Sequence, residues 1–139
     1  MKIYFTGSIS GGRSNVGIYQ QIVEHIRKYG IILTEHVADP NLTARGENLP
    51  AKKIHDRDVD WVKESDVFIA EVSTPSLGVG YEIRIAIEHK KPVLCLYKSQ
   101  QDRLLSAMIR GNSEVLVKEY NSFEDAIKII DEFFATIAN

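Results

Sequence analysis

Hydrophobic residues along the chain fall into two patterns that alternate with one another. Short runs rich in Ile, Val, Leu, Phe and Tyr have the length and composition of buried β-strands. The segments between them repeat their apolar residues every three or four positions, as one face of a helix does. This alternation predicts βαβ units, and therefore an α/β fold with one parallel sheet covered by helices. The predicted strands are Lys2–Thr6, Ile31–Glu35, Asp66–Val72, Pro92–Lys98 and Glu114–Glu119.

Helical periodicity is present in four segments. The first ends at Gly30, the residue type that often follows a helix C-terminus. The last begins after Ser122, which is placed to cap it, and carries Asp125 in its first turn. The apolar positions that define the four helices are Tyr19, Ile22, Val23, Ile26 and Tyr29; Ile54, Val59 and Val62 within 51–64; Val79, Ile83, Ala86 and Ile87; and Phe123, Ile127, Ile130, Phe134 and Ile137.

The longest irregular connection is Ala38–Pro50, which contains Pro, Asn, Gly and Thr without any periodicity. A connection of this length is either a lid or rim loop of a binding site or an ordinary surface loop. The sequence pattern leaves both interpretations open.

The size and charge of the chain narrow the class of protein. Its 139 residues, 44% hydrophobic and 26% charged, suit a single globular domain over 1–139. The 19 acidic and 17 basic residues are mixed along the chain, so it lacks the basic surface that binds nucleic-acid polymers or anionic membranes. A strand that starts near Met1 leaves no room for a cleavable signal, and no apolar run approaches a membrane span, so a cytoplasmic location is expected. The single cysteine, Cys95, is expected to be a buried thiol.

The first predicted strand runs into a turn rich in glycine and serine, within Tyr4–Arg13. Free backbone N–H groups, hydroxyls and a following helix N-terminus suit an anion such as a phosphate, and Arg13 could add positive charge. The spacing is neither G-x-G-x-x-G nor a Walker P-loop, which argues against a dinucleotide and against Mg-assisted phosphoryl transfer. A purely structural βα turn would also use such glycines, so that interpretation stays open.

A second candidate segment, Ser73–Glu82, follows the third predicted strand. In open parallel sheets ligands bind beyond the carboxyl ends of the strands, and two glycines in this segment let a ligand approach the backbone. The apolar period places Glu82 in the first turn of the next helix. There its carboxylate would either serve a ligand or only complement the helix dipole.

A further acid, Asp58, lies three residues before Trp61 on one predicted helical face. An acid beside an aromatic surface could meet a flat ligand such as a nucleobase, or be an ordinary surface acid beside a half-buried Trp. Together with Glu82 and the anion-suited turn, Asp58 completes a pair of carboxylates, which is what cleavage of a bond to a sugar requires. His36, at the end of the second predicted strand, is a possible residue of the same cleft.

Other catalytic classes are disfavoured by the sequence. The histidines lack the i, i+4 pairs and cysteine partners of metal sites, so no metal and no cofactor are expected. The chain also has no G-x-S-x-G elbow, which argues against a Ser-His-Asp hydrolase. The four isolated histidines are His25, His36, His55 and His89.

Taken together, these segments resemble the 2′-deoxynucleoside 5′-phosphate N-hydrolases, a branch of the nucleoside 2-deoxyribosyltransferase superfamily. The motifs occur in family order and span most of the chain. They are Tyr-Phe-x-Gly-Ser-Ile-x-Gly-Gly-Arg at Tyr4–Arg13, Leu-Thr-Glu-His-Val at Leu33–Val37, Asp-x-x-Trp at Asp58–Trp61, Ala-Glu-Val at Ala70–Val72, Pro-Ser-Leu-Gly-Val-Gly-Tyr-Glu at Pro75–Glu82, and Leu-Ser-Ala-Met-Ile-Arg-Gly at Leu105–Gly111.

This resemblance implies a flavodoxin-like (Rossmann-like) three-layer sandwich with a five-stranded parallel sheet, and a homodimer with shared active sites. It implies hydrolysis of the N-glycosidic bond of 2′-deoxynucleoside 5′-monophosphates to the free base and 2-deoxyribose 5-phosphate. Glu82 would be the nucleophile that forms a glycosyl-enzyme intermediate, Tyr4 would orient it, and Asp58 would assist departure of the base. The phosphate pocket would comprise Gly7, Ser8, Ile9, Ser76 and Gly78, with Ser106 contributed by the other subunit.

One position departs from the family pattern. Ser10 stands where well-known members carry an arginine in the phosphate loop, so weaker phosphate affinity is expected, although Arg13 matches the family. Two alternatives to the hydrolase stay open: a transferase that moves deoxyribose between bases through the same Glu82 intermediate, and a non-catalytic nucleotide-binding module with the same fold.

Overall fold

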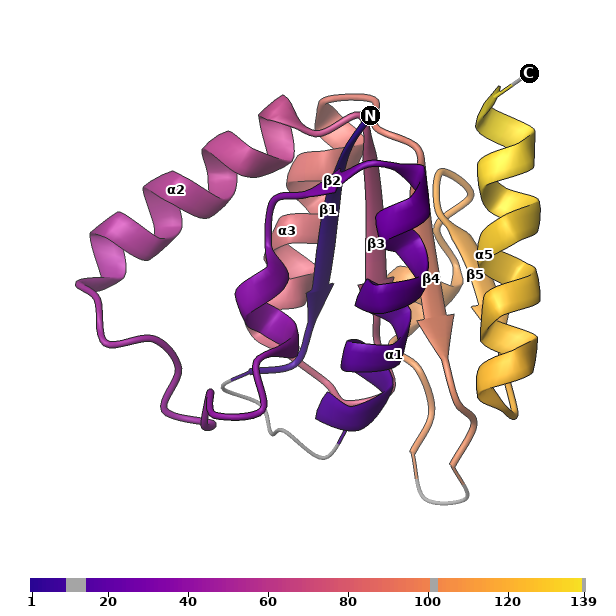
Figure 1. The fold of residues 1–139 in the computed structure, drawn as a ribbon, viewed down its shortest axis with the longest axis horizontal. Helices are drawn as coiled ribbons and strands as arrows, with labels where there is room; N and C mark the ends of the chain where they lie inside the picture. The colour runs from indigo at the N-terminus through magenta and orange to yellow at the C-terminus, as the bar shows by residue number, and fades with distance from the viewer. Residues whose placement is uncertain (10–14, 101–102, 139) are drawn as a thin grey trace.

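A computed structural model of the chain describes residues 1–9, 15–100 and 103–138. Within these residues, five parallel strands form one sheet in the order β2-β1-β3-β4-β5 (Figure 1). The predicted α/β fold class is therefore confirmed. The strands are β1 (Lys2–Gly7), β2 (Ile31–Ile32), β3 (Val67–Glu71), β4 (Val93–Tyr97) and β5 (Leu116–Glu119).

Helices cover both faces of the sheet, which gives the molecule three layers (Figure 1). The helices α1 and α5 lie on one face, and α2 and α3 lie on the other. Over the described residues, every helix is too short or too polar to cross a bilayer. The helices are α1 (Val16–Ile26), α2 (Ala51–Glu64), α3 (Leu77–Glu88), α4 (Ala107–Arg110) and α5 (Phe123–Ala138), with 3-10 turns η1 (Arg27–Tyr29) and η2 (Glu35–Ala38).

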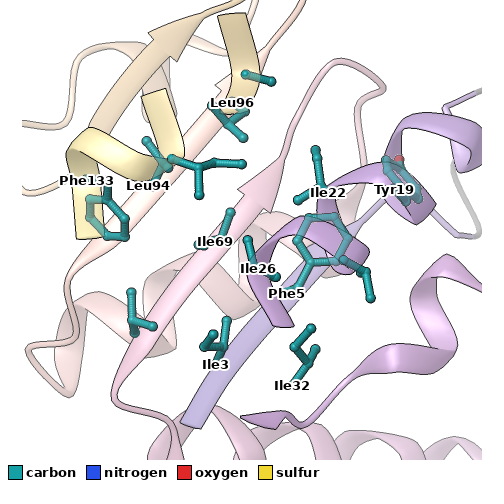
Figure 2. Packing of buried hydrophobic residues seen from close by; sticks show 14 of the residues in the cluster. Ile3, Phe5, Tyr19, Ile22, Ile26, Ile32, Ile69, Leu94, Leu96 and Phe133 are labelled. Atoms are coloured by element: carbon teal, nitrogen blue, oxygen red, sulfur yellow. The ribbon is translucent and has the colours of Figure 1, made fainter. Parts of the chain in front are cut away.

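The core is divided by the alternation of side chains along β1. Ile3 and Phe5 belong to a cluster that packs under α1 and α5, and Figure 2 shows this cluster with Tyr19 of α1 beside Phe5. Tyr4 points to the opposite face, where it stacks on Phe68 beneath α3. Because Tyr4 is on the α3 side, its hydroxyl can reach a side chain of that helix. The free Cys95 is buried in the second cluster, as predicted.

The second strand is shorter than the predicted Ile31–Glu35. Beyond Ile32, a side-chain hydroxyl takes the place of the backbone hydrogen bonds to β1. The hydroxyl of Thr34 donates to the carbonyl oxygen of Phe5 and accepts from the Phe5 N–H at 3.0 Å. The chain then turns into η2 instead of continuing along β1. Residues 39–50 follow as an irregular segment, here named the loop 39–50, which agrees with the predicted irregular connection.

Two other boundaries differ from the sequence pattern for local reasons. β5 begins two residues after the predicted Glu114, because the Asn112 side chain accepts the Glu114 N–H at 2.8 Å and forms a turn there. The first helix ends as an α-helix at Ile26 and continues to Tyr29 only as the 3-10 turn η1. The Ser122 cap is confirmed, since its hydroxyl accepts from the Asp125 N–H at 3.2 Å.

Candidate active site

Glu82 lies in the second turn of α3 and faces the sheet. The helix begins at Leu77, because the Ser76 side chain caps it by accepting the Val79 N–H at 3.3 Å. The prediction that Glu82 lies in the first turn is therefore wrong, since the helix starts before the first apolar position of its period. The carboxylate consequently points inward toward β1, and not to the helix end where it would complement the dipole.

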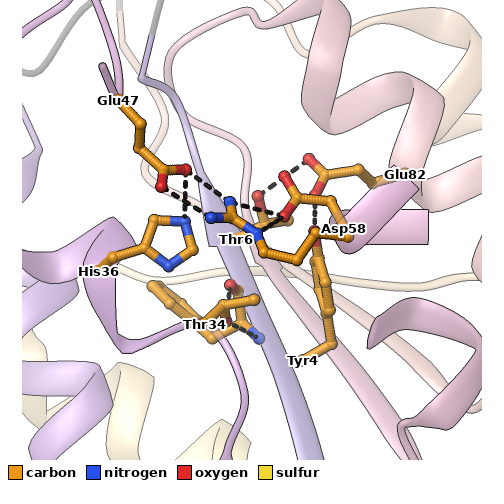
Figure 3. Close-up of polar contacts among 9 residues, drawn as sticks. Tyr4, Thr6, Thr34, His36, Glu47, Asp58 and Glu82 are labelled. Atoms are coloured by element: carbon orange, nitrogen blue, oxygen red, sulfur yellow. Dashed lines mark hydrogen bonds and ion pairs between the residues drawn. The ribbon is translucent and has the colours of Figure 1, made fainter. Parts of the chain in front are cut away.

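Two hydroxyls of β1 hold the Glu82 carboxylate. Tyr4 donates to one oxygen and Thr6 donates to the other at 3.1 Å (Figure 3). Burial raises the pKa of Glu82 to about 7; the Tyr4 hydrogen bond opposes this rise, and the charge of Asp58 adds to it. Burial and the same two carboxylates raise the pKa of Tyr4 as well, so its phenol stays a donor. Glu82 is thus oriented by two hydroxyls, and its carboxyl can exchange a proton near neutral pH.

Asp58 comes from α2, and Figure 3 shows its carboxylate near that of Glu82. Its carboxylate accepts two hydrogen bonds from the neighbouring Arg57, at 2.9 and 3.0 Å. Burial raises the pKa of Asp58, and the Arg57 hydrogen bonds oppose that rise. The charge of Asp58 adds to the rise in the pKa of Glu82, so the ionisation of Glu82 is coupled to that of Asp58.

These acids line one pocket of about 220 Å³ at the carboxyl ends of the strands, here named the site pocket. This is where an open parallel sheet binds ligands. Of the predicted residues, the structure places Tyr4, Asp58, Glu82, Gly7, Ile9, His36, Ser76 and Gly78 in its wall. The wall also contains residues that were not predicted for the site, namely Thr6, Val37, Arg45, Gly46, Glu47, Ile54 and Val79. Arg45 and Glu47 lie in the predicted irregular segment. Their place in the pocket wall agrees with the interpretation of that segment as a rim loop, which named neither residue.

The anion-suited turn is only partly described. A Cβ at Gly7 would lie 2.5 Å from the ring of Tyr19, so only glycine fits at this point. The N–H of Ser8 donates to the Tyr19 hydroxyl at 2.8 Å, and Ser8 is buried outside the pocket wall. Ser10 and Arg13 lie outside the described residues.

A buried carboxylate holds the loop that carries Ser76. Glu71, the last residue of β3, is fully buried and accepts hydrogen bonds from the Ser73 hydroxyl and, at 2.9 Å, from the Ser73 N–H. The Ser73 hydroxyl in turn accepts the Lys98 N–H at 2.8 Å, which ties the loop after β3 to the loop after β4. Burial raises the pKa of Glu71, which favours its neutral form. The cap of α3 therefore rests on a fixed loop.

A larger apolar groove of about 570 Å³ adjoins the site pocket through Ser76 and Val79. Ser106 lines this groove and is absent from the wall of the site pocket as the described residues define it. Its hydroxyl accepts the Met108 N–H at 3.2 Å and caps α4, a structural role that the sequence did not reveal. Leu104 and Met108 in the groove wall are 73% and 82% exposed, so the groove presents unburied apolar surface.

The rings of Trp61 and His36 lie close to each other. The ring centroids of Trp61 and His36 are 5.9 Å apart, and the Arg57 guanidinium lies 4.6 Å from the Trp61 ring. Trp61 is absent from the wall of the site pocket as far as the described residues define it, whereas His36 is part of that wall. Trp61, the predicted aromatic neighbour of Asp58, thus contacts Arg57, and His36 contributes to the wall of the site pocket.

Metal-ligating side chains do not gather in the described part of the chain: no group of three His, Cys, Asp or Glu residues there could hold an ion. The polar side chains in the pocket wall are three carboxylates (Glu47, Asp58 and Glu82), hydroxyls, an imidazole and an arginine. This donor set suits acid–base and nucleophilic chemistry on a small polar ligand.

Comparison with known sequences identifies the family. The sequence model described as "Nucleoside 2-deoxyribosyltransferase" matches residues 3–130. The chain belongs to the nucleoside 2-deoxyribosyltransferase family. Within this family it is 48% identical to a Danio rerio protein named 5-hydroxymethyl-dUMP N-hydrolase, over 99% of this chain and 98% of that protein. A Homo sapiens protein of the same name is 44% identical, over 95% of this chain and 78% of its own length.

Solved structures agree with the family fold. The structure of the CMP N-glycosidase BcmB of Clostridium botulinum superposes with a TM-score of 0.72 at 18% identity, over 96% of this chain and 99% of that one. The solution structure of BlsM gives a TM-score of 0.75 at 19% identity, over 99% of this chain and 94% of that one. At these sequence identities the similarity concerns the fold alone. Both solved structures share the arrangement of sheet and helices seen in this chain.

Proposed function

We propose that the chain is a hydrolase that cleaves the N-glycosidic bond of 2′-deoxynucleoside 5′-monophosphates, releasing the free base and 2-deoxyribose 5-phosphate. The observation that carries the proposal is the pocket in which Glu82, held by Tyr4 and Thr6, lies with Asp58. Family membership and the 48% identity to a protein named 5-hydroxymethyl-dUMP N-hydrolase support the substrate class. 5-Hydroxymethyl-dUMP is therefore the first substrate to test.

The reaction would proceed in two steps. A carboxylate oxygen of Glu82 attacks C1′, the C1′–N bond breaks, and the base leaves with its electron pair and a proton from Asp58. Water then attacks C1′, the bond to Glu82 breaks, and the proton of the water passes to Asp58. A 2′-deoxy sugar lacks the electron-withdrawing 2′-hydroxyl, so its oxocarbenium-like centre forms readily. Tyr4 stays protonated and keeps the nucleophile oriented through both steps.

The 5′-phosphate would lie at the start of α3. Ser76 and Gly78 line the pocket there, and Gly7 and Ile9 line it at the end of β1. A helix N-terminus attracts anions, and a Cβ at Gly78 would meet only the Ser76 hydroxyl, at 3.9 Å, so the backbone is open to a ligand. Ser8, Ser10 and Arg13 complete the proposed phosphate residues from the turn.

The product assay tests this function directly. The purified protein is incubated with each of the four deoxynucleoside monophosphates and with 5-hydroxymethyl-dUMP, and free base is measured by chromatography. Ribonucleotides serve as controls for the missing 2′-hydroxyl. We expect base release from deoxynucleotides, and a preference for ribonucleotides would overturn the substrate class.

We also propose a homodimer in which Ser106 of each subunit completes the phosphate site of the other. Support comes from the apolar groove beside the site pocket, where Leu77, Leu104 and Met108 are 97%, 73% and 82% exposed. Replacing Leu104 and Met108 together by Glu is expected to give a monomer in sedimentation velocity and to weaken binding of the monophosphate. A double variant that sediments like the wild type would contradict this pairing.

The place of action would be the cytoplasm, where the unpaired Cys95 stays a thiol.

A transferase is the second candidate, because the matching family model carries that description. Such an enzyme would pass the Glu82-bound deoxyribose to a second base instead of to water. Adding a free base to the assay separates the two functions. Base exchange on an unphosphorylated deoxynucleoside would favour the transferase and count against the hydrolase.

A non-catalytic nucleotide-binding module is the third possibility. It would bind deoxynucleotides with the same pocket and release base no faster than the Glu82→Ala variant. The bonded arrangement of Tyr4, Thr6 and Glu82 favours an enzyme, since a binding module has no need of a carboxylate with a raised pKa.

A further inference from the structure

The loop 39–50 is fastened to α2 by a two-point ion pair. The Arg57 guanidinium donates from its two terminal nitrogens to the two oxygens of Glu47, at 2.8 and 2.6 Å. Both side chains are largely buried, with exposed fractions of 25% for Arg57 and 18% for Glu47. This parallel arrangement is specific to arginine, because lysine presents a single point charge.

A turn within the loop directs Glu47 toward α2. Gly46 has a φ of +77°, a conformation that glycine adopts readily, and its N–H donates to the Thr43 carbonyl at 2.9 Å. Glu47 follows directly, and its carboxylate also contacts the His36 ring nitrogen at 3.2 Å. The loop therefore brings one carboxylate to two basic side chains beside the site pocket (Figure 3).

The same guanidinium holds the candidate acid. Arg57 contacts Asp58 through two nitrogens, at 2.9 and 3.0 Å, while its plane lies near the Trp61 ring. One side chain is thus fixed on three sides, by a loop carboxylate, by a helix carboxylate and by an aromatic ring. Glu47 and Asp58 both bind the guanidinium of Arg57. Removing either carboxylate is therefore expected to change how Arg57 contacts the other.

We propose that Arg57 is a positioning residue of the reaction, which Glu47 holds in place and which in turn holds Asp58 toward the leaving base. This inference rests on the proposed function, because Asp58 has a leaving group to serve only in a hydrolase or transferase. The loop 39–50 then does more than cover the pocket, since its Glu47 fixes the acid through Arg57. Neither Arg57 nor Glu47 needs to touch the sugar or the phosphate.

The first test is a double-mutant cycle on turnover. Glu47→Gln and Arg57→Gln are each expected to lower kcat about tenfold while KM for the monophosphate changes less than twofold, and the double variant is expected to be no worse than Arg57→Gln alone. Arg57→Lys should not restore the rate, because it cannot make both contacts. The matched control is Lys52→Gln, which breaks an exposed i, i+4 ion pair with Asp56 on the same helix and should leave kcat and KM unchanged. Additive losses, or full rescue by lysine, would overturn the proposal.

The second test needs no catalysis. Trp61 is the single tryptophan of the chain, so intrinsic fluorescence of the free protein reports on the Arg57 position. Glu47→Gln should shift the emission toward that of Arg57→Gln, whereas Lys52→Gln should not shift it, and circular dichroism confirms that each variant is folded. Unchanged emission in Glu47→Gln would overturn the proposal. If the wild type released no base, the proposed function would fail while this fluorescence result would still decide whether Glu47 holds Arg57.

Discussion

Glu82 and Asp131 each accept a hydrogen bond from a tyrosine hydroxyl, and their pKa values shift in opposite directions. Glu82 accepts from Tyr4 in the site pocket, where burial raises its pKa to about 7. Asp131 of α5 accepts from Tyr29 on the surface, where its pKa is lowered to about 2. The pair of functional groups is the same in both places, so the difference lies in what surrounds it.

The surroundings differ in water and in neighbouring charge. At Asp131 a slight burial is outweighed by hydrogen bonds from Tyr29, His25 and Lys28, with His25 at 2.7 Å and Lys28 at 3.1 Å. At Glu82 burial removes the carboxylate from water, and the charge that acts on it is that of the acid Asp58, which raises its pKa further. A tyrosine hydrogen bond thus orients a carboxylate in either setting, and desolvation together with the sign of the neighbours decides whether it is poised to titrate near neutrality.

Removing the carboxylate itself gives the largest expected effect. Glu82→Gln keeps the shape of the side chain but cannot attack C1′, so base release should fall by at least about 1,000-fold. Chromatography of the free base measures this loss. Asp131→Asn is the matched control, because it removes a tyrosine-bonded carboxylate far from the pocket, and its turnover should equal that of the wild type. If Glu82→Gln had wild-type turnover, Glu82 would not be the nucleophile, and its raised pKa would have no part in the reaction.

Removing the acidic neighbour should invert the pH dependence. In the proposed mechanism the productive state has Glu82 ionised and Asp58 protonated, so kcat/KM should fall as the pH rises above about 7, the pKa of Glu82, and both acids become ionised. Asp58→Asn should lower the rate about 100-fold or more, the usual contribution of a general acid. Its residual kcat/KM should rise with pH, because only Glu82 must then ionise, with a midpoint below about 7 since the Asp58 charge is gone. Profiles of the same direction in both proteins would refute this division of roles.

Removing the tyrosine donor should have a smaller effect. Tyr4→Phe deletes a hydrogen bond that favours ionised Glu82, so the pKa of Glu82 should rise further and the alkaline limb of kcat/KM should move to higher pH. A hydrogen bond to a charged group is worth about 1.5–3 kcal/mol, which corresponds to a loss of roughly 10- to 100-fold in rate. Steady-state kinetics across pH measures both changes. Thr6→Val, which removes the other donor, should move the limb in the same direction and serves as the comparison.

The sequence pattern predicts the layers of this fold because burial repeats along the chain. Apolar runs and helical periods are local properties, and they identify the five strands and the helices that cover them. The short β2 could not be predicted in this way, because the hydroxyl of Thr34 bonds to Phe5, 29 residues earlier. The family motifs led to Glu82, Asp58 and Tyr4, whose roles stay predictions until they are measured.

The side chains that surround those three were harder to predict, because their positions depend on contacts between elements. The inward direction of Glu82 follows from where Ser76 caps α3, and the apolar period alone placed the helix start too late. The contact of Glu47 with Arg57 joins an irregular loop to a helix, and nothing periodic marks either residue. Thr6 shares the pocket only because β1 passes under α3.

Asp131 supplies the smallest expected effect and completes the comparison. Because its folded pKa is lowered, its contribution to stability is present above the ordinary aspartate pKa and is lost as the pH falls through about 2. Its side chain is 39% exposed, so solvent screening limits this contribution to about 1 kcal/mol at most. Asp131→Asn should therefore lower the unfolding free energy slightly at neutral pH in urea titrations. The difference from the wild type should shrink near pH 2. Lys28→Gln, which removes one partner of Asp131, should show part of the same decrease at neutral pH. If the unfolding free energy fell as much at pH 2 as at pH 7, Asp131 would stabilise the fold through packing and not through its charge. Its hydrogen bond from Tyr29 could then no longer be compared with the hydrogen bond from Tyr4 to the ionisable Glu82.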